Sequence, residues 1–294
     1  MRTNPFSGTG IALVTPFQSN GELDQPALVR LVNHCISGGV DFLVALGTTG
    51  ETATLTSEEK KRVLQTVAET ANGRAPLVVG VGGNNTRAVC DSLQSGMPEG
   101  YSGVLSVSPY YNKPTQEGIY QHYKAVCGST DAPVILYNVP GRTGSNVLAE
   151  TTLRVAHDCP NAVAMKEASG NLEQAMAIVQ GAPHGFEVLS GDDNLTLPLI
   201  ASGATGVISV SGQAYPGLFS QMVRDARSGH MDRARAVHYA LFRFTQLLFA
   251  EGNPGGIKAA MAQLGVMENQ VRLPLVPVSS SLQGELRKAM AELA

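Results

Sequence analysis

Short apolar runs rich in β-branched residues recur along the chain, and Gly, Pro, Asn or Ser bounds each of them. Runs of this length and composition are typical of strands that are covered on both faces. They follow one another at similar intervals as far as residue 212. Eight strands are predicted in this way, at residues 10–16, 41–47, 77–83, 103–109, 133–140, 163–169, 187–193 and 206–212.

The segments between these runs have helical spacing. The clearest is 57–71, where apolar side chains recur every three or four residues and where Thr56 and Glu59 have the spacing of a capping box. Eight alternations of strand and helix predict a parallel sheet, and the count of eight favours a closed α/β TIM (β/α)8 barrel. An open, doubly wound sheet is the structural alternative.

The pattern becomes wholly helical after the eighth strand. Helices are expected at residues 218–228, 231–250, 256–264 and 282–293, and the Pro-rich segment 272–277 is expected to be extended. The length of 294 residues fits one barrel of about 250 residues with an appendage. We therefore expect a catalytic barrel domain over residues 1–225 and a C-terminal α-helical domain over residues 226–294.

Composition narrows the class of protein. Hydrophobic residues make up 43% and charged residues 15% of the chain, which is typical of a packed globular protein. The net charge of -3, with no basic run, argues against nucleic acid and anionic membranes as partners. The N-terminus has no apolar stretch of signal-peptide length, and no run approaches the ~18 apolar residues of a membrane span, so a cytoplasmic location is expected. The four dispersed cysteines suit neither a zinc site nor a disulfide framework.

Lys166 ends the sixth predicted strand, directly after an apolar stretch. In a (β/α)8 barrel the functional side chains sit at the C-terminal ends of the strands. The amine is therefore expected to enter a partly dehydrated site, which disfavours the charged form. A neutral amine is a nucleophile toward a ketone. The alternative is a structural lysine paired with the neighbouring Glu167.

Three hydroxyl-bearing residues follow other strands: Thr48, Tyr111 and Tyr137. Such groups suit the transfer of protons to and from a carbonyl oxygen, although barrel tyrosines often only pack. Arg142, between two glycines, offers a planar fork for a carboxylate, although a solvated loop arginine is the commoner case.

Other motif classes find little support. Residues 80–85 lack the third glycine of a dinucleotide fingerprint, and the chain contains neither a Walker A sequence nor a G-x-S-x-G elbow. Asp192 and Asp193 could hold a metal beside a histidine, but the histidines mostly fall outside the strand ends. We interpret the two aspartates as cap and loop residues, and we expect no metal site.

The motifs Gly47-Thr-Thr-Gly-Glu51 and Tyr137-Asn-Val-Pro-Gly-Arg142-Thr, together with Lys166, resemble those of the dihydrodipicolinate synthase family, a group of pyruvate-dependent lysine Schiff-base aldolases. The resemblance spans nearly the whole chain. Residues 6–17 are similar to the family's opening segment, and Asn253-Pro254 with residues 272–277 are similar to its closing one.

This resemblance implies a lyase in which Lys166 forms an imine with pyruvate. Thr48, Tyr137 and Tyr111 would form the proton relay, with Tyr111 reaching into the site of a neighbouring subunit. The implied reaction condenses pyruvate with L-aspartate 4-semialdehyde on the route to diaminopimelate and lysine. It needs no metal or organic cofactor, because the protonated imine is the electron sink.

The resemblance also assigns the rest of the pocket. Arg142 would bind the carboxylate of the aldehyde, Thr49 and Gly191 would line the pyruvate pocket, and the backbone around Ile208 would complete it. Relatives that cleave N-acetylneuraminate or keto-deoxy sugars share the lysine, the tyrosine and the threonine loop, and Arg142 favours the synthase over these aldolases. A non-catalytic keto-acid sensor is a further alternative, which would have no need of a proton relay.

Assembly and regulation follow from the same resemblance. The family implies a homotetramer built from two tight dimers. Lysine-inhibited members carry an allosteric pocket between subunits, at positions that align with Thr52, Ala53, Ser57, Lys60, Asn84, Ala88 and Tyr110. Asn84 and Tyr110 match that pattern, whereas Ser57, Lys60 and Ala88 depart from it. Lys60 adds a charge like that of the effector and Ala88 removes an anion, so weak or absent feedback is expected.

Overall fold

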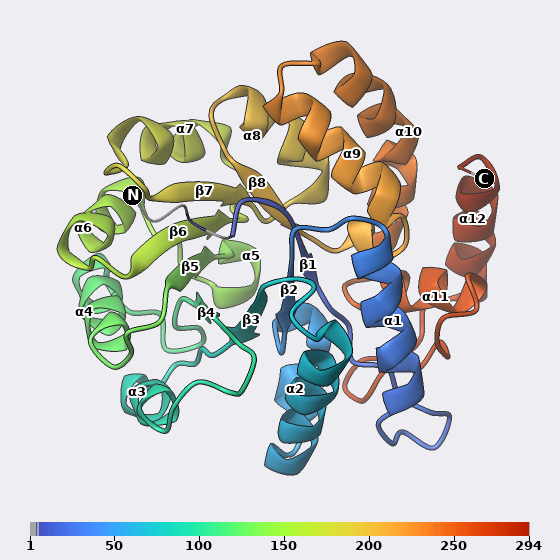
Figure 1. The fold of residues 1–294 in the computed structure, drawn as a ribbon, viewed down its shortest axis with the longest axis horizontal. Coiled ribbons are helices and arrows are strands. Elements are labelled where there is room, and N and C mark those ends of the chain that lie inside the picture. Colours follow the sequence, from blue (N-terminus) through green and yellow to red (C-terminus); the bar gives the residue numbers. More distant parts are fainter. Residues whose placement is uncertain (1–3, 5, 294) are drawn as a thin grey trace.

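Eight parallel strands close into a barrel in a computed structural model that describes residues 4 and 6–293 (Figure 1). Each strand pairs with its neighbours in chain order, and β1 closes the ring against β8 through a register that matches Gly8 with Gly206. The strands are β1 (Gly8–Ala12), β2 (Phe42–Ala45), β3 (Leu77–Gly80), β4 (Gly103–Val107), β5 (Val134–Asn138), β6 (Ala162–Glu167), β7 (Glu187–Ser190) and β8 (Gly206–Ser209). The TIM barrel is confirmed, and the open sheet is wrong.

All eight strands lie where the apolar runs predicted them, but they are shorter. β1 begins two residues before the predicted start, and most strands end several residues before the predicted limits. The residues beyond each strand leave the ladder and form turns over its C-terminal end. Short 3₁₀ turns follow β2, β7 and β8, namely η1 (Thr48–Gly50), η2 (Thr52–Thr54), η3 (Asp193–Leu195) and η4 (Ser211–Gln213).

Helices cover the outside of the barrel (Figure 1). They are α1 (Gln25–Ser37), α2 (Ser57–Ala71), α3 (Thr86–Gln94), α4 (Gln116–Cys127), α5 (Pro140–Thr143), α6 (Ala149–Asp158), α7 (Leu172–Gly181), α8 (Thr196–Ala201) and α9 (Pro216–Arg227). α2 has the predicted bounds. Its capping box is confirmed, because Thr56 accepts from the Glu59 N–H while the Glu59 carboxylate accepts from the Thr56 N–H.

Alternation along the strands divides the apolar side chains into two cores. One lies between the strands and the helices, and it contains Leu136 and Met165. The other fills the barrel, and it contains Ile135, Tyr137 and Ala164. Side chains of successive strand residues point to opposite faces of a sheet. Tyr137 and Lys166 therefore point into the barrel, whereas the residues directly after them point outward.

Three further helices form the C-terminal extension: α10 (Met231–Phe249), α11 (Gly255–Gln263) and α12 (Ser280–Ala291). α10 packs against α9, and all three pack against one another (Figure 1). α9 crosses the predicted domain boundary at residue 225, and that boundary stays a prediction. Within residues 4 and 6–293, no helix is long and apolar enough to cross a bilayer.

The connection between α11 and α12 differs from the expectation. Residues 272–277 are not fully extended, because the chain turns at Leu273 and Pro274 and the Leu275 N–H bonds to the Arg272 carbonyl at 3.0 Å. The turn follows the point at which the Arg272 guanidinium binds the carbonyls of Gly21 and Thr54. These contacts anchor the C-terminal extension to the barrel.

Candidate active site

Lys166 and Tyr137 lie side by side at the C-terminal end of the barrel. The parallel register of β5 and β6 pairs them directly, and the Lys166 Nζ atom lies 4.3 Å from the centroid of the Tyr137 ring. Both side chains are almost fully enclosed, with exposures of 5% and 6%. The strand pairing thus places an amine and a phenol together in a site with little water.

The alternative of a Lys166–Glu167 ion pair is wrong, because Glu167 faces away from the barrel interior. Its buried carboxylate accepts from the Asn138 side chain at 3.1 Å, from the Gln174 side chain at 3.0 Å and from the Ser169 N–H at 2.7 Å. Uncharged donors therefore satisfy Glu167 on the outer face. Among the described residues, no carboxylate forms an ion pair with Lys166.

Asn138 connects this outer network to the loop that carries Arg142. Its amide nitrogen donates to the Asn146 side chain at 2.7 Å, and its side-chain oxygen accepts from the Val147 N–H at 3.0 Å. Asn138 and Glu167 are paired in the register one step after Tyr137 and Lys166. The hydrogen bonds of Asn138 and Glu167 on the outer face therefore hold Tyr137 and Lys166 in register on the inner face. Sequence reasoning missed it, although a polar residue at the outward position of two apolar strands was an available signal.

The threonine loop follows β2. Thr48 is exposed at its tip, whereas Thr49 is buried and accepts a hydrogen bond of 2.9 Å from the Asn253 side chain. Arg142, exposed on α5, donates to the Asn253 carbonyl at 3.3 Å. Asn253 of the C-terminal extension therefore joins two predicted site residues. Its motif carried the family resemblance, but no role in the site was predicted for it.

Tyr111 does not reach the Lys166 pocket within this chain. Its side chain is 88% exposed, and its backbone has a φ of 71°, in the left-handed region that non-glycine residues rarely adopt. Tyr110 beside it is 41% exposed. The loop after β4 therefore holds a large aromatic ring away from its own subunit.

Gly191 and Ile208 lie at the two strands that follow β6. The Gly191 N–H bonds to the Glu167 carbonyl at 2.7 Å, and a Cβ atom there would come within 2.5 Å of the Ala168 Cβ. A side chain at Gly191 would therefore push against the segment that carries Lys166. Ile208 is 1% exposed, in the same interior core as Tyr137.

The two aspartates after β7 have different roles. Asp193 is buried, and its carboxylate accepts from the Val210 and Ser211 N–H groups and from the Ser211 hydroxyl, which confirms a loop hydrogen-bonding role. Asp192 makes no side-chain capping bond. Burial and then the neighbouring Asp193 raise the pKa of Asp192, while Lys166 acts in the opposite direction. Among residues 4 and 6–293, no group of three or more His, Cys, Asp or Glu side chains could hold a metal ion.

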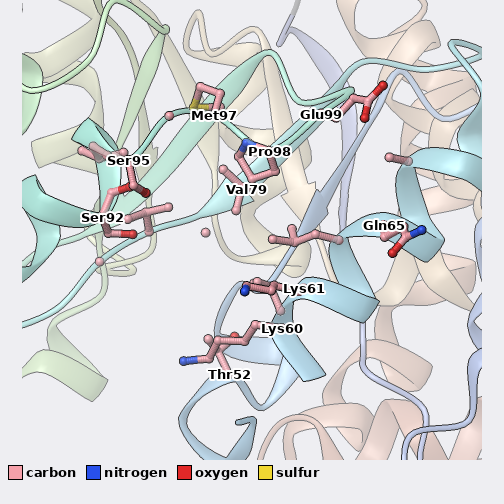
Figure 2. Close-up of a pocket in the computed structure, with 18 of the residues that line it drawn as sticks. Thr52, Lys60, Lys61, Gln65, Val79, Ser92, Ser95, Met97, Pro98 and Glu99 are labelled. Atoms are coloured by element: carbon pink, nitrogen blue, oxygen red, sulfur yellow. The ribbon is translucent and has the colours of Figure 1, made fainter. Parts of the chain in front are cut away.

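A groove of about 1140 Å³ lies away from the barrel mouth, between α2 and the β3–α3 segment. Figure 2 shows Lys60 and Lys61 of α2 on one side and Ser92 and Ser95 on the other. Among the predicted allosteric positions, the groove is lined by Thr52, Lys60, Asn84 and Ala88. Ala53, Ser57 and Tyr110 do not line it. The structure thus gathers most of these positions, and it places them outside the Lys166 pocket.

Known proteins resemble this chain in both sequence and fold. A model of the dihydrodipicolinate synthetase family matches residues 5–293. The 4-hydroxy-tetrahydrodipicolinate synthase of Flavobacterium psychrophilum is 53% identical over 281 residues, covering 96% of each chain. A monomeric dihydrodipicolinate synthase variant matches with a TM-score of 0.95 and 41% identity, over 98% of this chain and 97% of that one. The chloride-inhibited enzyme of Acinetobacter baumannii, complexed with pyruvate, matches with a TM-score of 0.94 and 37% identity, over 97% and 98%.

The chain therefore belongs to the dihydrodipicolinate synthetase family of (β/α)8 barrels. Its activity is that of a 4-hydroxy-tetrahydrodipicolinate synthase, a lyase that uses pyruvate in the biosynthesis of diaminopimelate and lysine. These findings favour the synthase over the sugar aldolases and the keto-acid sensor.

The outer network makes a testable prediction. Glu167→Gln brings an N–H group toward three donors and leaves one of them without an acceptor, which costs about 1–3 kcal/mol. We expect a lower free energy of unfolding in urea. We also expect a loss of kcat of up to about 10²-fold, because the ends of β5 and β6 shift. Glu173→Gln, which removes the same charge from an exposed position on α7, is the matched control. Unchanged unfolding and kcat in Glu167→Gln would contradict the role of the network.

Proposed function

We propose that Lys166 forms the imine with pyruvate. The single observation that carries this proposal is the enclosed position of its amine beside Tyr137 at the C-terminal end of the barrel. A lysine amine in its unprotonated form is a nucleophile toward a ketone, and the enclosed position holds it where the ketone of pyruvate would bind. The amine adds to the ketone carbon, and loss of water from the resulting carbinolamine gives the imine.

Thr48, Tyr137 and Tyr111 would transfer protons during these steps. The protonated imine withdraws electrons from the pyruvate methyl group, which loses a proton to give an enamine. The enamine carbon then bonds to the aldehyde carbon of L-aspartate 4-semialdehyde. Attack by the amine of that substrate on the imine carbon closes the ring and releases Lys166. Hydroxyl groups suit each of these proton transfers, because they can both donate and accept.

Arg142 would hold the carboxylate of the aldehyde. Its guanidinium is exposed at the rim and donates one N–H to the Asn253 carbonyl. The remaining N–H groups of the planar guanidinium can bind a carboxylate in a bidentate manner. Thr49, Gly191 and the backbone near Ile208 would line the pyruvate pocket. This assignment is supported by their positions around Lys166: Thr49 follows β2, Gly191 follows β7 and Ile208 lies on β8.

The imine can be tested by mass. Reduction with borohydride in the presence of pyruvate should attach one reduced pyruvate to the wild-type chain and to Lys124→Ala, a control at an exposed lysine of α4. Lys166→Ala should gain no adduct and should lose condensation activity, because the amine that bonds to the ketone carbon is removed. Intact mass spectrometry and a coupled assay with both substrates measure the two effects. An adduct that survives in Lys166→Ala would overturn the assignment.

We propose a homotetramer of two tight dimers in which Tyr111 completes the partner's relay. The support is the 88% exposed ring on a left-handed backbone, which leaves nearly the whole ring open to a contact from another subunit. One of the related structures is a monomeric variant, so that protein adopts the same fold without assembly. A cytoplasmic location also stays a prediction.

Subunit mixing tests the shared site. Tyr111→Phe should lose activity by about 10²-fold or more, because a relay hydroxyl is removed. Tyr239→Phe, at a 66% exposed ring on α10, should not lose activity. Refolding Tyr111→Phe together with inactive Lys166→Ala should restore activity, since a hybrid dimer regains one intact site. No recovery in hybrids that form, or a fully active monomer, would show that Tyr111 does not act across the interface.

We further propose that lysine inhibits this enzyme weakly or not at all. Lys60 and Ala88 line the groove, so at these two positions an effector's amino group would meet a cation and would find no carboxylate. A lysine titration of the purified enzyme should leave activity nearly unchanged at concentrations that inhibit a lysine-regulated relative. Potent inhibition would contradict the proposal. Ala88→Glu with Lys60→His should introduce sensitivity.

A further inference from the structure

Glu51 lies at the end of the threonine loop, and its side chain points away from the pocket into the C-terminal extension. Its Oε1 atom lies 2.5 Å from the Lys258 Nζ atom of α11, and its Oε2 atom accepts from the Arg272 N–H at 2.9 Å. The Glu51 and Lys258 side chains are 1% and 0% exposed. A fully buried ion pair therefore joins the loop of Thr48 to a helix outside the barrel.

Specific contacts surround the amine of Lys258. Its amine also donates to the Gln270 carbonyl at 2.8 Å, and it lies 4.1 Å from the centroid of the Phe17 ring. The Arg272 guanidinium lies 4.2 Å from the same centroid. Burial lowers the pKa of Lys258 to about 8, and the Glu51 carboxylate opposes that shift. The charged pair is thus held by specific contacts in a site that penalises charge.

The backbone of Glu51 needs an external restraint. Its φ is 51°, in the left-handed region, and it joins the two turns η1 and η2. Its N–H bonds to the Thr48 carbonyl at 3.2 Å, and the preceding Gly50 carbonyl accepts from the Thr15 hydroxyl at 2.7 Å. A carboxylate locked at its far end would hold this strained residue, and with it Thr48, in one place.

Stability alone is a weak explanation for such a pair. Replacement of a buried ion pair by apolar groups of similar volume is often neutral or stabilising, because two charges no longer have to be desolvated. The pair connects the loop of Thr48 to α11, and its further contacts reach Gln270 and Arg272 in the segment that follows α11. Its geometry therefore points to the placement of the loop.

We propose that Glu51 and Lys258 are positioning residues, which fix Thr48 at the rim of the Lys166 pocket from the C-terminal extension. This inference rests on the proposed relay role of Thr48. Loss of the pair should loosen η1 and displace the Thr48 hydroxyl, while Tyr137, Lys166 and the strands that carry them stay in place.

The test is a mutant cycle with Thr48. The double variant Glu51→Gln/Lys258→Met removes both charges together, so neither is left buried and unpaired. We expect kcat to fall at least about 10-fold, which is part of the ~10²–10⁴-fold that a well-placed proton-transfer group contributes. Thr48→Val should lower kcat by itself. Adding it to the double variant should cost less than about 3-fold more, because residues that act through one another are not additive.

Controls separate the possible failures. Glu285→Gln/Arg243→Met removes an exposed pair with a 2.6 Å contact from the same C-terminal helices and should leave kcat unchanged. If the double variant does not fold, Glu51→Asp replaces it, because this change keeps the charge and shortens the side chain. The loss of kcat in Glu51→Asp should also vanish in the Thr48→Val background. The positioning role is overturned if the loss of kcat caused by the double variant or by Glu51→Asp is as large in the Thr48→Val background as in the wild type. A folded double variant with full kcat overturns it as well. An active Thr48→Val would instead refute the relay.

Discussion

The pairing of β5 with β6 is the constraint on which the chemistry of this barrel depends. It aligns Tyr137 with Lys166 inside the barrel and Asn138 with Glu167 outside it. A shift of the register by one residue would turn every side chain to the opposite face, which would bury the carboxylate in the barrel and remove the amine from the pocket. The amide groups around Glu167 oppose that shift, because they would lose their acceptor. A buried carboxylate held by neutral donors thus specifies the place of a reactive amine that it does not touch.

A second consequence concerns the C-terminal extension. The barrel by itself supplies Lys166, Tyr137 and the threonine loop, but side chains of the C-terminal extension add contacts that hold the loop and Arg142. Asn253 joins Thr49 to Arg142, and Lys258 binds Glu51. Loops at the mouth of a barrel have few neighbours of their own, so their geometry needs such support. The extension therefore shapes the site without contributing a residue that is proposed to react.

The sequence was sufficient to predict the fold class and the place of each strand, because buried parallel strands appear as continuous apolar runs and eight runs in alternation with helices leave few topologies. The α2 bounds followed from its caps. The exact strand limits could not be predicted, since an apolar residue that leaves the ladder, such as Leu46 at φ 57°, looks no different from one that stays. Lys166 and its hydroxyl neighbours were found by position and motif. Asn138, Glu167, Asn253 and Lys258 were missed as site residues, because their importance depends on contacts between segments far apart in the chain.

The left-handed residues show how these contacts act together. Glu51 and Tyr111 both adopt a backbone conformation that costs free energy; Glu51 ends the turn that begins at Thr48, and Tyr111 itself carries a proposed relay hydroxyl. For Glu51 the compensation is visible within the chain, since two anchors hold its carboxylate. For Tyr111 the turn is closed within the chain, because the Asn112 N–H bonds to the Tyr110 carbonyl at 2.9 Å, but the ring itself is 88% exposed. The local bond holds the backbone turn, but it leaves the ring uncovered, and a contact from the proposed partner subunit would cover it. The exposed ring therefore supports the proposed assembly on grounds other than the family resemblance.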